Sequence, residues 1–503
     1  MDFQVNEELE KLRNGNACWI PAKCPFCFHV IPAFSAAFRS ESVYTQQDLE
    51  ELSEMEQEKA DPYIERQDEL LEQYWKNFPG SKPMGKNETH AAMHAMNTEH
   101  NVIKNSNFEL DEDGFPYAMV DEFGRKTTRR LCPHCHNQLP HAYGKFPVRF
   151  IAVVGITSSG KTVFLSQLMD YIEEYLTRVN LVPIGIHEEL SEYVASHPIR
   201  RNKELPVGNP AHLMTLPLPI NVENRDTGER YTFIFYDIAG ENCVKPDQMQ
   251  KYGPFIENAD GIIMIIDPLQ FSDTFDLDAM IDDERDMARP EKVANAMYTA
   301  FIDAHSSVSG KSPVPVAIAI SKSDMLRPYF ENRYTQAHIM FPINYSQYPP
   351  NMRGMAFDDC RNVNEEMRRL LIGNGGNLQG ETFMNSIDSC FTNSAYFAFS
   401  SLGVMPTSKE DENGNKIFFM DESPERTRLE EPFYWLLFRL GIIGAVAKDG
   451  RRGYMDPPAL IQNGGRANIM PVQKPMFFAQ QAIPNNTIKD KKVKEPRISR
   501  KRR

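Results

Sequence analysis

The stretch that decides the fold is RFIAVVGITSSGKTV, from Arg149 to Val163. An apolar run, Phe150 to Val154, leads into the pattern G-x-x-x-x-G-K-T, which begins at Gly155. This spacing is that of a phosphate-binding loop between a buried strand and a helix. Its glycines let the backbone turn tightly enough for several N–H groups to face one polyphosphate, and the helix that follows adds its positive N-terminal end.

The side chains of the loop support the same interpretation. Lys161 is long enough to reach the β- and γ-phosphates, and the hydroxyl of Thr162 suits Mg²⁺. An amphipathic pattern from Val163 to Leu176 predicts the helix after the loop. The alternative is an ordinary strand–turn–helix. The predicted phosphate-site residues are Gly155, Ser158, Ser159, Gly160, Lys161, Thr162 and Val163.

The composition limits the class of protein. With 503 residues the chain is too long for one typical core, so we expect two or more domains. The net charge of −14 argues against nonspecific nucleic-acid binding by the whole surface, and eight cysteines in so long a chain do not indicate a disulfide scaffold. The acidic N-terminus lacks the apolar segment of a signal peptide. No apolar run approaches ~20 residues, so no transmembrane helix is expected.

Two C-P-x-C pairs lie far apart in the sequence and indicate a metal site. Each compact turn brings two thiolates together. Four thiolates suit a tetrahedral Zn²⁺ and leave no open coordination position, which favours a structural metal over a catalytic one. We therefore expect a zinc ribbon made of residues 17–40 and 128–146; two unrelated turns or a redox dithiol are the alternatives. The four cysteines are Cys24, Cys27, Cys132 and Cys135.

The insertion that splits this ribbon, residues 41–127, is polar. Its acidic stretch from Thr45 to Asn77 predicts one or two solvated helices, and Phe115 to Arg130 predicts a hairpin that runs into the second cysteine pair. His90 and His94 have a spacing that suits a metal, but no third ligand is evident. The histidines near the cysteine pairs are interpreted as surface residues; they are His29, His134, His136 and His141.

Two strands and an acidic motif follow the phosphate loop. Leu216 to Val222 and Arg230 to Tyr236 alternate in polarity as strands joined by a turn. Asp237, at the carboxyl end of the second strand, is suited to hold Mg²⁺ directly or through water. Gly240 lets its backbone N–H approach a γ-phosphate. Thr215 precedes the hairpin at a distance that suits a second Mg²⁺-binding hydroxyl, although another nearby hydroxyl is an alternative.

The last motif concerns the identity of the base. Two further buried strands are predicted at Gly261 to Asp267 and Val314 to Ile320, and the second leads into S-K-S-D, which ends at Asp324. A carboxylate at this position accepts hydrogen bonds from guanine N1 and N2, a pair that adenine does not offer. The stem of Lys322 is suited to cover the ring face. After one more strand, a backbone N–H near Ser401 is placed to meet guanine O6.

The order of these motifs resembles the GTPases of the P-loop superfamily, in their translation-factor-related class, over about residues 148–447. The resemblance implies an α/β fold in three layers with a mostly parallel sheet, guanine nucleotide (GTP or GDP) and Mg²⁺ as cofactors, and hydrolysis of GTP to GDP and phosphate. It carries family roles over to Gly155, Gly160, Lys161 and Thr162 for phosphate and Mg²⁺, to Asp237 and Gly240 for the γ-phosphate, and to Lys322, Asp324 and Ser401 for guanine.

Two residues depart from this family pattern. Ser321 begins the base motif where Asn or Thr is usual, which is expected to weaken a hydrogen bond that braces the loop. Glu241 stands where many such GTPases have the Gln that positions water. Because a γ-phosphate repels a carboxylate, we expect slow hydrolysis or dependence on a partner. For Glu241, a catalytic role and pairing with a surface base remain alternatives.

A split C-P-x-C ribbon in front of such a domain resembles the zinc-ribbon-bearing, double-GTPase-type proteins of bacterial conflict or defence gene clusters. This resemblance implies a bacterial cytoplasmic protein whose partner is a regulatory or effector protein.

The nucleotide-binding domain is expected at residues 147–447, with insertions near 271–312 and 328–393. Within it, Leu429 to Val446 predicts a closing helix against the sheet. The tail, residues 448–503, ends in a basic segment and is expected to be disordered. Nucleic acid or an anionic surface is an open candidate for its target.

Taken together, the motifs favour a GTP-binding switch with slow Mg²⁺-dependent hydrolysis. The alternative is a nucleotide-stabilised scaffold that binds a macromolecule through the ribbon and tail without significant hydrolysis. An ATPase is a further alternative.

Overall fold

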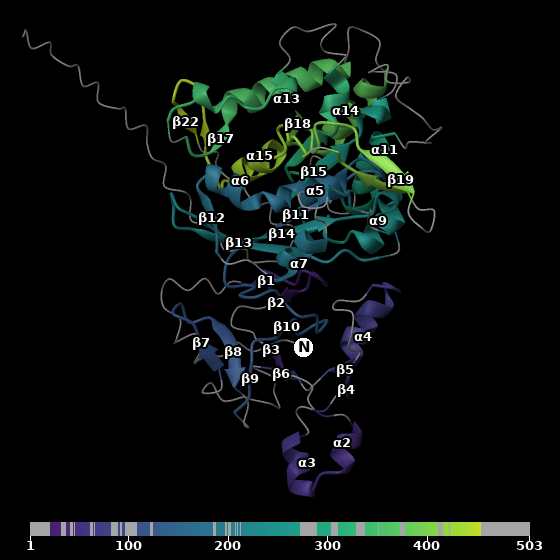
Figure 1. The fold of residues 1–503 in the computed structure, drawn as a ribbon, viewed down its shortest axis with the longest axis vertical. Helices are drawn as coiled ribbons and strands as arrows, with labels where there is room; N and C mark the ends of the chain where they lie inside the picture. Colours follow the sequence, from purple (N-terminus) through teal and green to yellow (C-terminus); the bar gives the residue numbers. More distant parts are fainter. Residues whose placement is uncertain are drawn as a thin grey trace, which may run out of the picture. The chain divides into compact units, whose positions relative to one another are not determined.

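A mostly parallel sheet organises the chain after the second cysteine pair (Figure 1). Its strands are β11 (Val148–Val154), β12 (Leu181–Pro183), β13 (Leu218–Asn224), β14 (Arg230–Asp237), β15 (Gly261–Ile266), β16 (Val316–Ile320) and β18 (Ser394–Ala398). Among the described residues these seven strands follow the order β12-β13-β14-β11-β15-β16-β18. Only β13 runs opposite to the other described strands of this sheet, pairing antiparallel with β12 and β14, and β14, β11, β15, β16 and β18 pair in parallel. The carboxyl ends of these five strands therefore meet at one edge of the sheet.

The computed structural model describes residues 21–31, 37–40, 44, 46–60, 64, 66–81, 89–90, 93–95, 108–120, 124–184, 188–196, 199, 203–206, 208, 210–211, 213–271, 289–302, 310–327, 338–350, 352–372, 378–410, 416–421 and 423–453. The basic end of the tail and its predicted disorder lie outside these ranges, as does most of the predicted insertion near 271–312.

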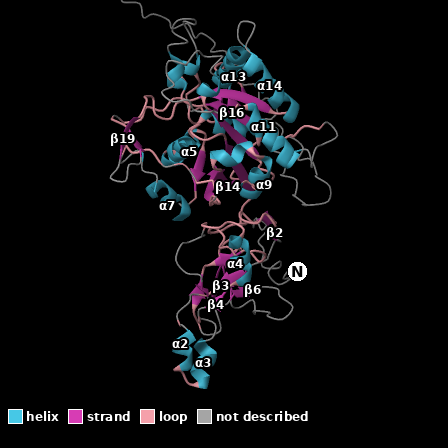
Figure 2. Ribbon diagram, turned by 90° about the vertical axis from the view of Figure 1, so that its right-hand side faces the viewer, coloured by secondary structure: helices cyan, strands magenta, loops and turns pink. Residues whose placement is uncertain are grey.

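Helices cover both faces of the sheet, as Figure 2 shows. They are α5 (Lys161–Asp170), α6 (Ile172–Arg178), α7 (Glu188–Ser196), α9 (Pro246–Tyr252), α11 (Glu291–Met297), α13 (Phe357–Ile372), α14 (Leu378–Cys390) and α15 (Glu431–Arg439). Side chains alternate along β11, so Ile151 packs with α5, α6, α7 and α15. Phe150 belongs to the cluster of α9, α11, α13 and α14 on the opposite face. This layering confirms the predicted three-layer α/β fold.

The predicted closing helix is shorter than expected. Leu429 to Val446 was expected to be helical throughout, but α15 ends at Arg439 and Ala445–Val446 forms strand β21. The turn between them contains Gly441, whose positive φ of 72° breaks the helical path. Two short strands, β17 (Met355–Ala356) and β22 (Arg452–Gly453), pair with β21. The first residues of the predicted tail are therefore part of the fold.

Short strands and helices form the N-terminal part of the chain. They are β1 (Ala22–Lys23), β2 (Val30–Ile31), β3 (Ala37–Arg39), α2 (Gln46–Glu50), α3 (Glu54–Ala60), β4 (Arg66–Gln67), α4 (Glu69–Lys76), β5 (Thr89–His90), β6 (Met93–Ala95), β7 (Phe108–Leu110), β8 (Pro116–Val120), β9 (Lys126–Thr127) and β10 (Arg130–Leu131). In the described part of Thr45 to Asn77, three helices thus lie where the sequence predicts one or two.

The hairpin predicted at Phe115 to Arg130 is only partly formed. β9 pairs with β8 as expected, but β10 pairs with β3 instead. The chain leaves β8 after Thr127, whose hydroxyl donates to the backbone carbonyl of Arg39 at 2.6 Å. The N–H of Arg39 in turn donates to the carbonyl of Arg129 at 2.9 Å.

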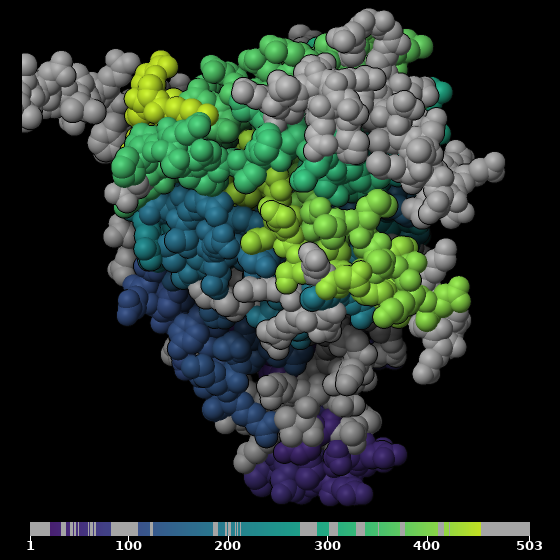
Figure 3. All heavy atoms as spheres, turned by 45° about the horizontal axis from the view of Figure 1, so that its top comes forward, coloured from purple at the N-terminus to yellow at the C-terminus, as the bar shows by residue number. Residues whose placement is uncertain are grey.

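A second hairpin, which the sequence did not indicate, follows the predicted base loop. It consists of β19 (Thr407–Glu410) and β20 (Lys416–Phe419). All four residues of β19 are exposed, and Figure 3 shows the hairpin (yellow-green) on the surface. Within the described ranges, no helix combines the length and apolar character needed to cross a membrane.

Candidate nucleotide site and zinc centre

The phosphate loop joins β11 to α5 at the carboxyl edge of the sheet. Gly155 has a φ of 153°, and a Cβ there would lie 2.2 Å from the carbonyl oxygen of Ile265, so the position excludes a side chain. Gly160, with a φ of 90°, begins α5 in the left-handed region. Ser159 Oγ and Lys161 Nζ each donate to the carbonyl of Ile156 at 2.8 Å. The loop is therefore braced by its own side chains.

Three of the residues predicted to bind Mg²⁺ come together beside this loop. Thr162 Oγ1 donates to Asp237 Oδ2 at 3.0 Å, and Asp237 is buried at the end of β14. The hydroxyl of Thr215 donates to the backbone carbonyl of Asp237. Hydroxyl and carboxylate oxygens are the ligands that Mg²⁺ prefers, so this donor set fits the ion. Val163 follows Thr162 in the first turn of α5, half-buried.

Gly240 lies directly against the phosphate loop. A Cβ at this position would be 2.0 Å from the backbone nitrogen of Thr157. Gly240 also begins the 3-10 helix η3 (Gly240–Val244), and Glu241 is exposed beside it. The segment predicted to sense a γ-phosphate is thus in contact with the loop predicted to hold one.

Gly240→Ala is expected to weaken binding of a non-hydrolysable GTP analogue at least tenfold while changing GDP affinity less than about threefold. The reason is that the added methyl meets backbone atoms, which cannot rotate away, so the segment must move from the γ-phosphate position. Titration calorimetry with both nucleotides checks this.

Gly453→Ala is the matched control, because nothing lies within 4 Å of a Cβ at Gly453. Equal losses for both nucleotides in the Gly240 variant would contradict a role in sensing the γ-phosphate.

The predicted base motif follows β16 and contacts the phosphate loop. Lys322 has a positive φ of 51°, and its ammonium group donates to the Asp267 carboxylate and to the carbonyl of Ser158 at 3.1 Å. Ser321 Oγ donates to the carbonyl of Ser159 at 2.7 Å. Ser321 therefore does brace the loop, and the expectation that this brace is weaker than one made by Asn or Thr stays a prediction.

Asp324 is held by the neighbouring loop. Ser400 Oγ donates to Asp324 Oδ1 at 2.5 Å, and the N–H of Ser323 donates to the carbonyl of Phe399 at 3.0 Å. Ser401, which follows, is buried. The two loops predicted to contact guanine thus meet at the same edge as the phosphate loop.

Sequence reasoning missed two residues of this region. Asp267 is buried directly after the wholly apolar strand β15. A carboxylate at the end of such a strand was the available signal that this residue has a partner at the site. Ser400 gave no signal, since a serine before Ser401 is typical of any loop.

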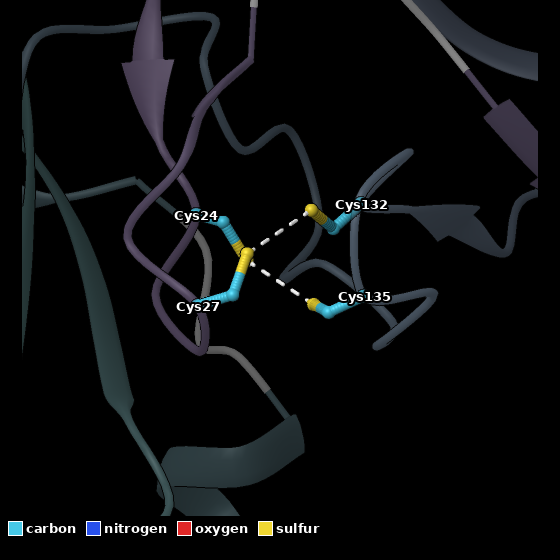
Figure 4. A group of neighbouring side chains, drawn as sticks. All are labelled: Cys24, Cys27, Cys132 and Cys135. Carbon is cyan, nitrogen blue, oxygen red and sulfur yellow. Dashed lines mark hydrogen bonds between the residues drawn. The ribbon is translucent and has the colours of Figure 1, made fainter. Parts of the chain in front are cut away.

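The four cysteines form a cluster. Their Sγ atoms all lie within 4.8 Å of one another, with 3.7 Å between Cys24 and Cys135 and between Cys27 and Cys132. In Figure 4 the sulfurs of the two pairs point toward one another from two separate segments. Burial raises the pKa of Cys24, whereas hydrogen bonds from neighbouring thiols, chiefly that of Cys132, lower the pKa of Cys27.

Polar groups around the cluster support thiolate charge. The N–H groups of Phe26 and His134 approach Cys24 Sγ and Cys132 Sγ at 3.4 Å, and Asn137 Nδ2 approaches Cys135 Sγ at 3.3 Å. Four sulfur donors with this support fit the tetrahedral set of a structural Zn²⁺.

The cysteine cluster packs on the sheet. The Phe28 ring lies 5.8 Å from that of Phe150 and 6.2 Å from that of Tyr236, measured between centroids. The hydroxyl of Tyr236 donates to the carbonyl of Pro25 at 2.7 Å. The first cysteine pair therefore packs on the face of the sheet that carries Phe150 and Tyr236.

The histidines of this region have different surroundings. His29 is exposed, and its ring stacks on that of His134. His136 contacts the Asp68 carboxylate at 2.8 Å and is only partly exposed, so its interpretation as a plain surface residue is wrong. His90 and His94 lie in two different strands, and their side chains are outside the described residues.

Residues 149–348 match the model of the family described as Double-GTPase 2. The proposed ESX-1 scaffolding and assembly protein SaeC of Mycolicibacterium smegmatis is 22% identical over 331 residues, covering 62% of this chain and 80% of that protein. A crystal structure of translation elongation factor SelB from Methanococcus maripaludis with the GTP analogue GppNHp is also similar. It is 12% identical, with a TM-score of 0.21, over 51% of this chain and 30% of the SelB chain. The family match confirms the resemblance to P-loop, double-GTPase-type proteins.

Proposed function

We propose that this chain, whose residues 149–348 match the Double-GTPase 2 family, is a GTP-binding switch that hydrolyses GTP slowly. The observation that carries the proposal is the meeting of three motifs at one sheet edge. Lys161 and Thr162 contribute the phosphate end, Asp237 the Mg²⁺ position, and Asp324 the base end. A guanine nucleotide needs all three: groups that bind its phosphates, a position for Mg²⁺, and a carboxylate that binds its base.

The chemistry follows from the placement of the charges. Mg²⁺, when bound by Thr162 and Asp237, would neutralise charge on the phosphates. Lys161 would exchange its contact with the Ile156 carbonyl for phosphate oxygens. Exposed Glu241 places a negative charge next to Gly240 in the chain, which supports slow turnover or activation by a partner protein.

Asp324→Asn is expected to lower GTP affinity by at least about 30-fold and to shift preference toward xanthosine triphosphate. An amide cannot accept both guanine N–H donors, and charge-assisted hydrogen bonds contribute about 1.5–3 kcal/mol each. Competition binding with both nucleotides measures the shift.

Asp388→Asn serves as the control, because Asp388 is half-exposed on α14. Displacement of GTP by equimolar ATP in the unaltered protein would instead favour the ATPase alternative.

A second candidate function, a nucleotide-stabilised assembly scaffold, is favoured by the name of the SaeC relative. Under this alternative GTP binds tightly and is not turned over. Phosphate release by the purified protein separates the two: release that depends on Lys161 supports the switch, and retention of intact GTP supports the scaffold.

We also propose a cellular setting for this switch. The double-GTPase likeness supports a bacterial conflict or defence system, a cytoplasmic location and a regulatory protein partner. The basic end of the tail supports binding to nucleic acid or an anionic surface. A pull-down compared between the GTP-analogue and GDP states tests the protein partner.

A further inference from the structure

Helix α4 ends against the segment around Thr215 and the helix that follows Gly240. Phe78, two residues after the helix, is buried with Met214 and Tyr252, and its ring centroid lies 6.1 Å from that of Tyr252. The N–H of Met214 donates to Ser81 Oγ at 2.7 Å. Met214 precedes Thr215, and Tyr252 is the last residue of α9. One short stretch, 78–81, therefore contacts both segments.

The segment around Thr215 is also bonded to the end of β14 and to η3, which leads into α9. Asn242, in η3, donates through Nδ2 to the carbonyl of Ala211 at 2.8 Å. The hydroxyl of Thr215 donates to the carbonyl of Asp237. Movement of either segment on loss of a γ-phosphate would therefore alter the surface on which Phe78 packs.

The other side of α4 is bound to the cysteine cluster. Trp75 Nε1 donates to Asn137 Oδ1 at 2.8 Å, and the amide of the same Asn137 contacts Cys135 Sγ. The hydroxyl of Tyr74 donates to the carbonyl of Phe26, inside the first cysteine pair, at 3.0 Å. Continuous contacts thus run from a zinc ligand through α4 to the nucleotide-sensing segments.

The start of α4 is anchored as well. Asp68 caps the helix by accepting from the N–H of Leu71 at 3.0 Å, and its carboxylate also contacts Arg39 and His136. These contacts stabilise the start of α4 and tie it to β3 and to the segment of the second cysteine pair.

We propose that α4 and residues 77–81 form a built-in effector that couples the state of the guanine nucleotide to the zinc ribbon. This inference rests on the proposed function. The docked arrangement keeps Thr215 beside Asp237, where it must lie to sense Mg²⁺ and the γ-phosphate. Docking of α4 therefore favours the triphosphate state, and by linkage the triphosphate favours the zinc-loaded ribbon.

The first test compares nucleotide affinities of the zinc-loaded full chain by calorimetry. Phe78→Ala is expected to weaken GppNHp binding about fivefold or more and GDP binding less than about twofold. About fivefold is the lower end of the affinity changes typical of coupling between two sites. Ser81→Ala, which removes one hydroxyl and no packing, is expected to act in the same direction. Leu70→Ala, on an exposed side of α4, is the matched control.

The reciprocal test measures zinc affinity by equilibrium competition with the chelator 4-(2-pyridylazo)resorcinol. In the unaltered chain, GppNHp is expected to raise zinc affinity relative to GDP, by the factor by which zinc raises the ratio of GppNHp to GDP affinity. The Phe78 variant should lose this difference. Equal zinc affinities in both states, or equal losses of GDP and GppNHp binding in both variants, would overturn the coupling. Failure of the unaltered chain to bind either nucleotide would instead overturn the proposed function.

Discussion

Lys161→Ala is expected to lower GTP affinity about 1,000-fold, or about 4 kcal/mol, and to abolish phosphate release. Lys161 is the buried first residue of α5, and its ammonium group donates to the Ile156 carbonyl within the phosphate loop. A bound triphosphate would offer it two or more charged oxygens, and each such hydrogen bond contributes about 1.5–3 kcal/mol. The Lys322 ammonium group also donates to a carbonyl of this loop, that of Ser158, but it is paired with the Asp267 carboxylate, so we do not expect it to replace Lys161. Titration calorimetry and a phosphate-release assay measure both effects.

Lys311→Ala is the control for this substitution. Lys311 also donates to a backbone carbonyl, that of Asp388 at 2.6 Å, but lies next to α14 rather than the loop. Its removal should leave GTP affinity within about twofold. If Lys161→Ala bound GTP as tightly as the unaltered chain, the glycine-rich loop would not be a phosphate site.

Cys135→Ala is expected to remove bound zinc and to lower the melting temperature by about 10 °C or more. Loss of one thiolate leaves three ligands and an open position, which weakens a structural site. The free energy of binding a structural zinc adds to the free energy of folding, because the four ligands meet only in the folded chain. Cys24, Cys132 and Cys135 also belong to the cluster that covers one face of the sheet, so the loss is expected to spread to the nucleotide domain.

Cys390→Ala is the matched control for the cysteine. It is as buried as Cys135, 3% against 4% exposed, and shares the same apolar face, but it lies in α14 and is not one of the four clustered cysteines. It should keep one zinc per chain and lose only the stability of a small core truncation, about 1–2 kcal/mol. Zinc content by mass spectrometry, together with thermal unfolding, separates the two variants. Equal zinc content would contradict the four-cysteine site.

Chain order and residue type were sufficient to predict the central strands of the sheet, though not its edge strand β12, and the elements of the candidate site. The torsions of Gly155 and Gly160 and the position of Asp237 at a strand end are local consequences of the sequence. Boundaries were less predictable. The apolar residues after Arg439 resemble a continued helix, and only the turn at Gly441 and the pairing of β21 show where it stops.

The sequence by itself determined the phosphate loop, the four cysteines and the order of the base motifs, because their spacing follows from backbone geometry and ligand chemistry within a few residues. Only the tertiary structure decided that Asp267 holds Lys322 and that Ser400 holds Asp324. It also decided that α4 and the residues just after it contact both the four-cysteine cluster and the segment before Thr215. These contacts join residues far apart in the chain. They depend on how buried surfaces fit together, for which no local pattern in the sequence provides a signal.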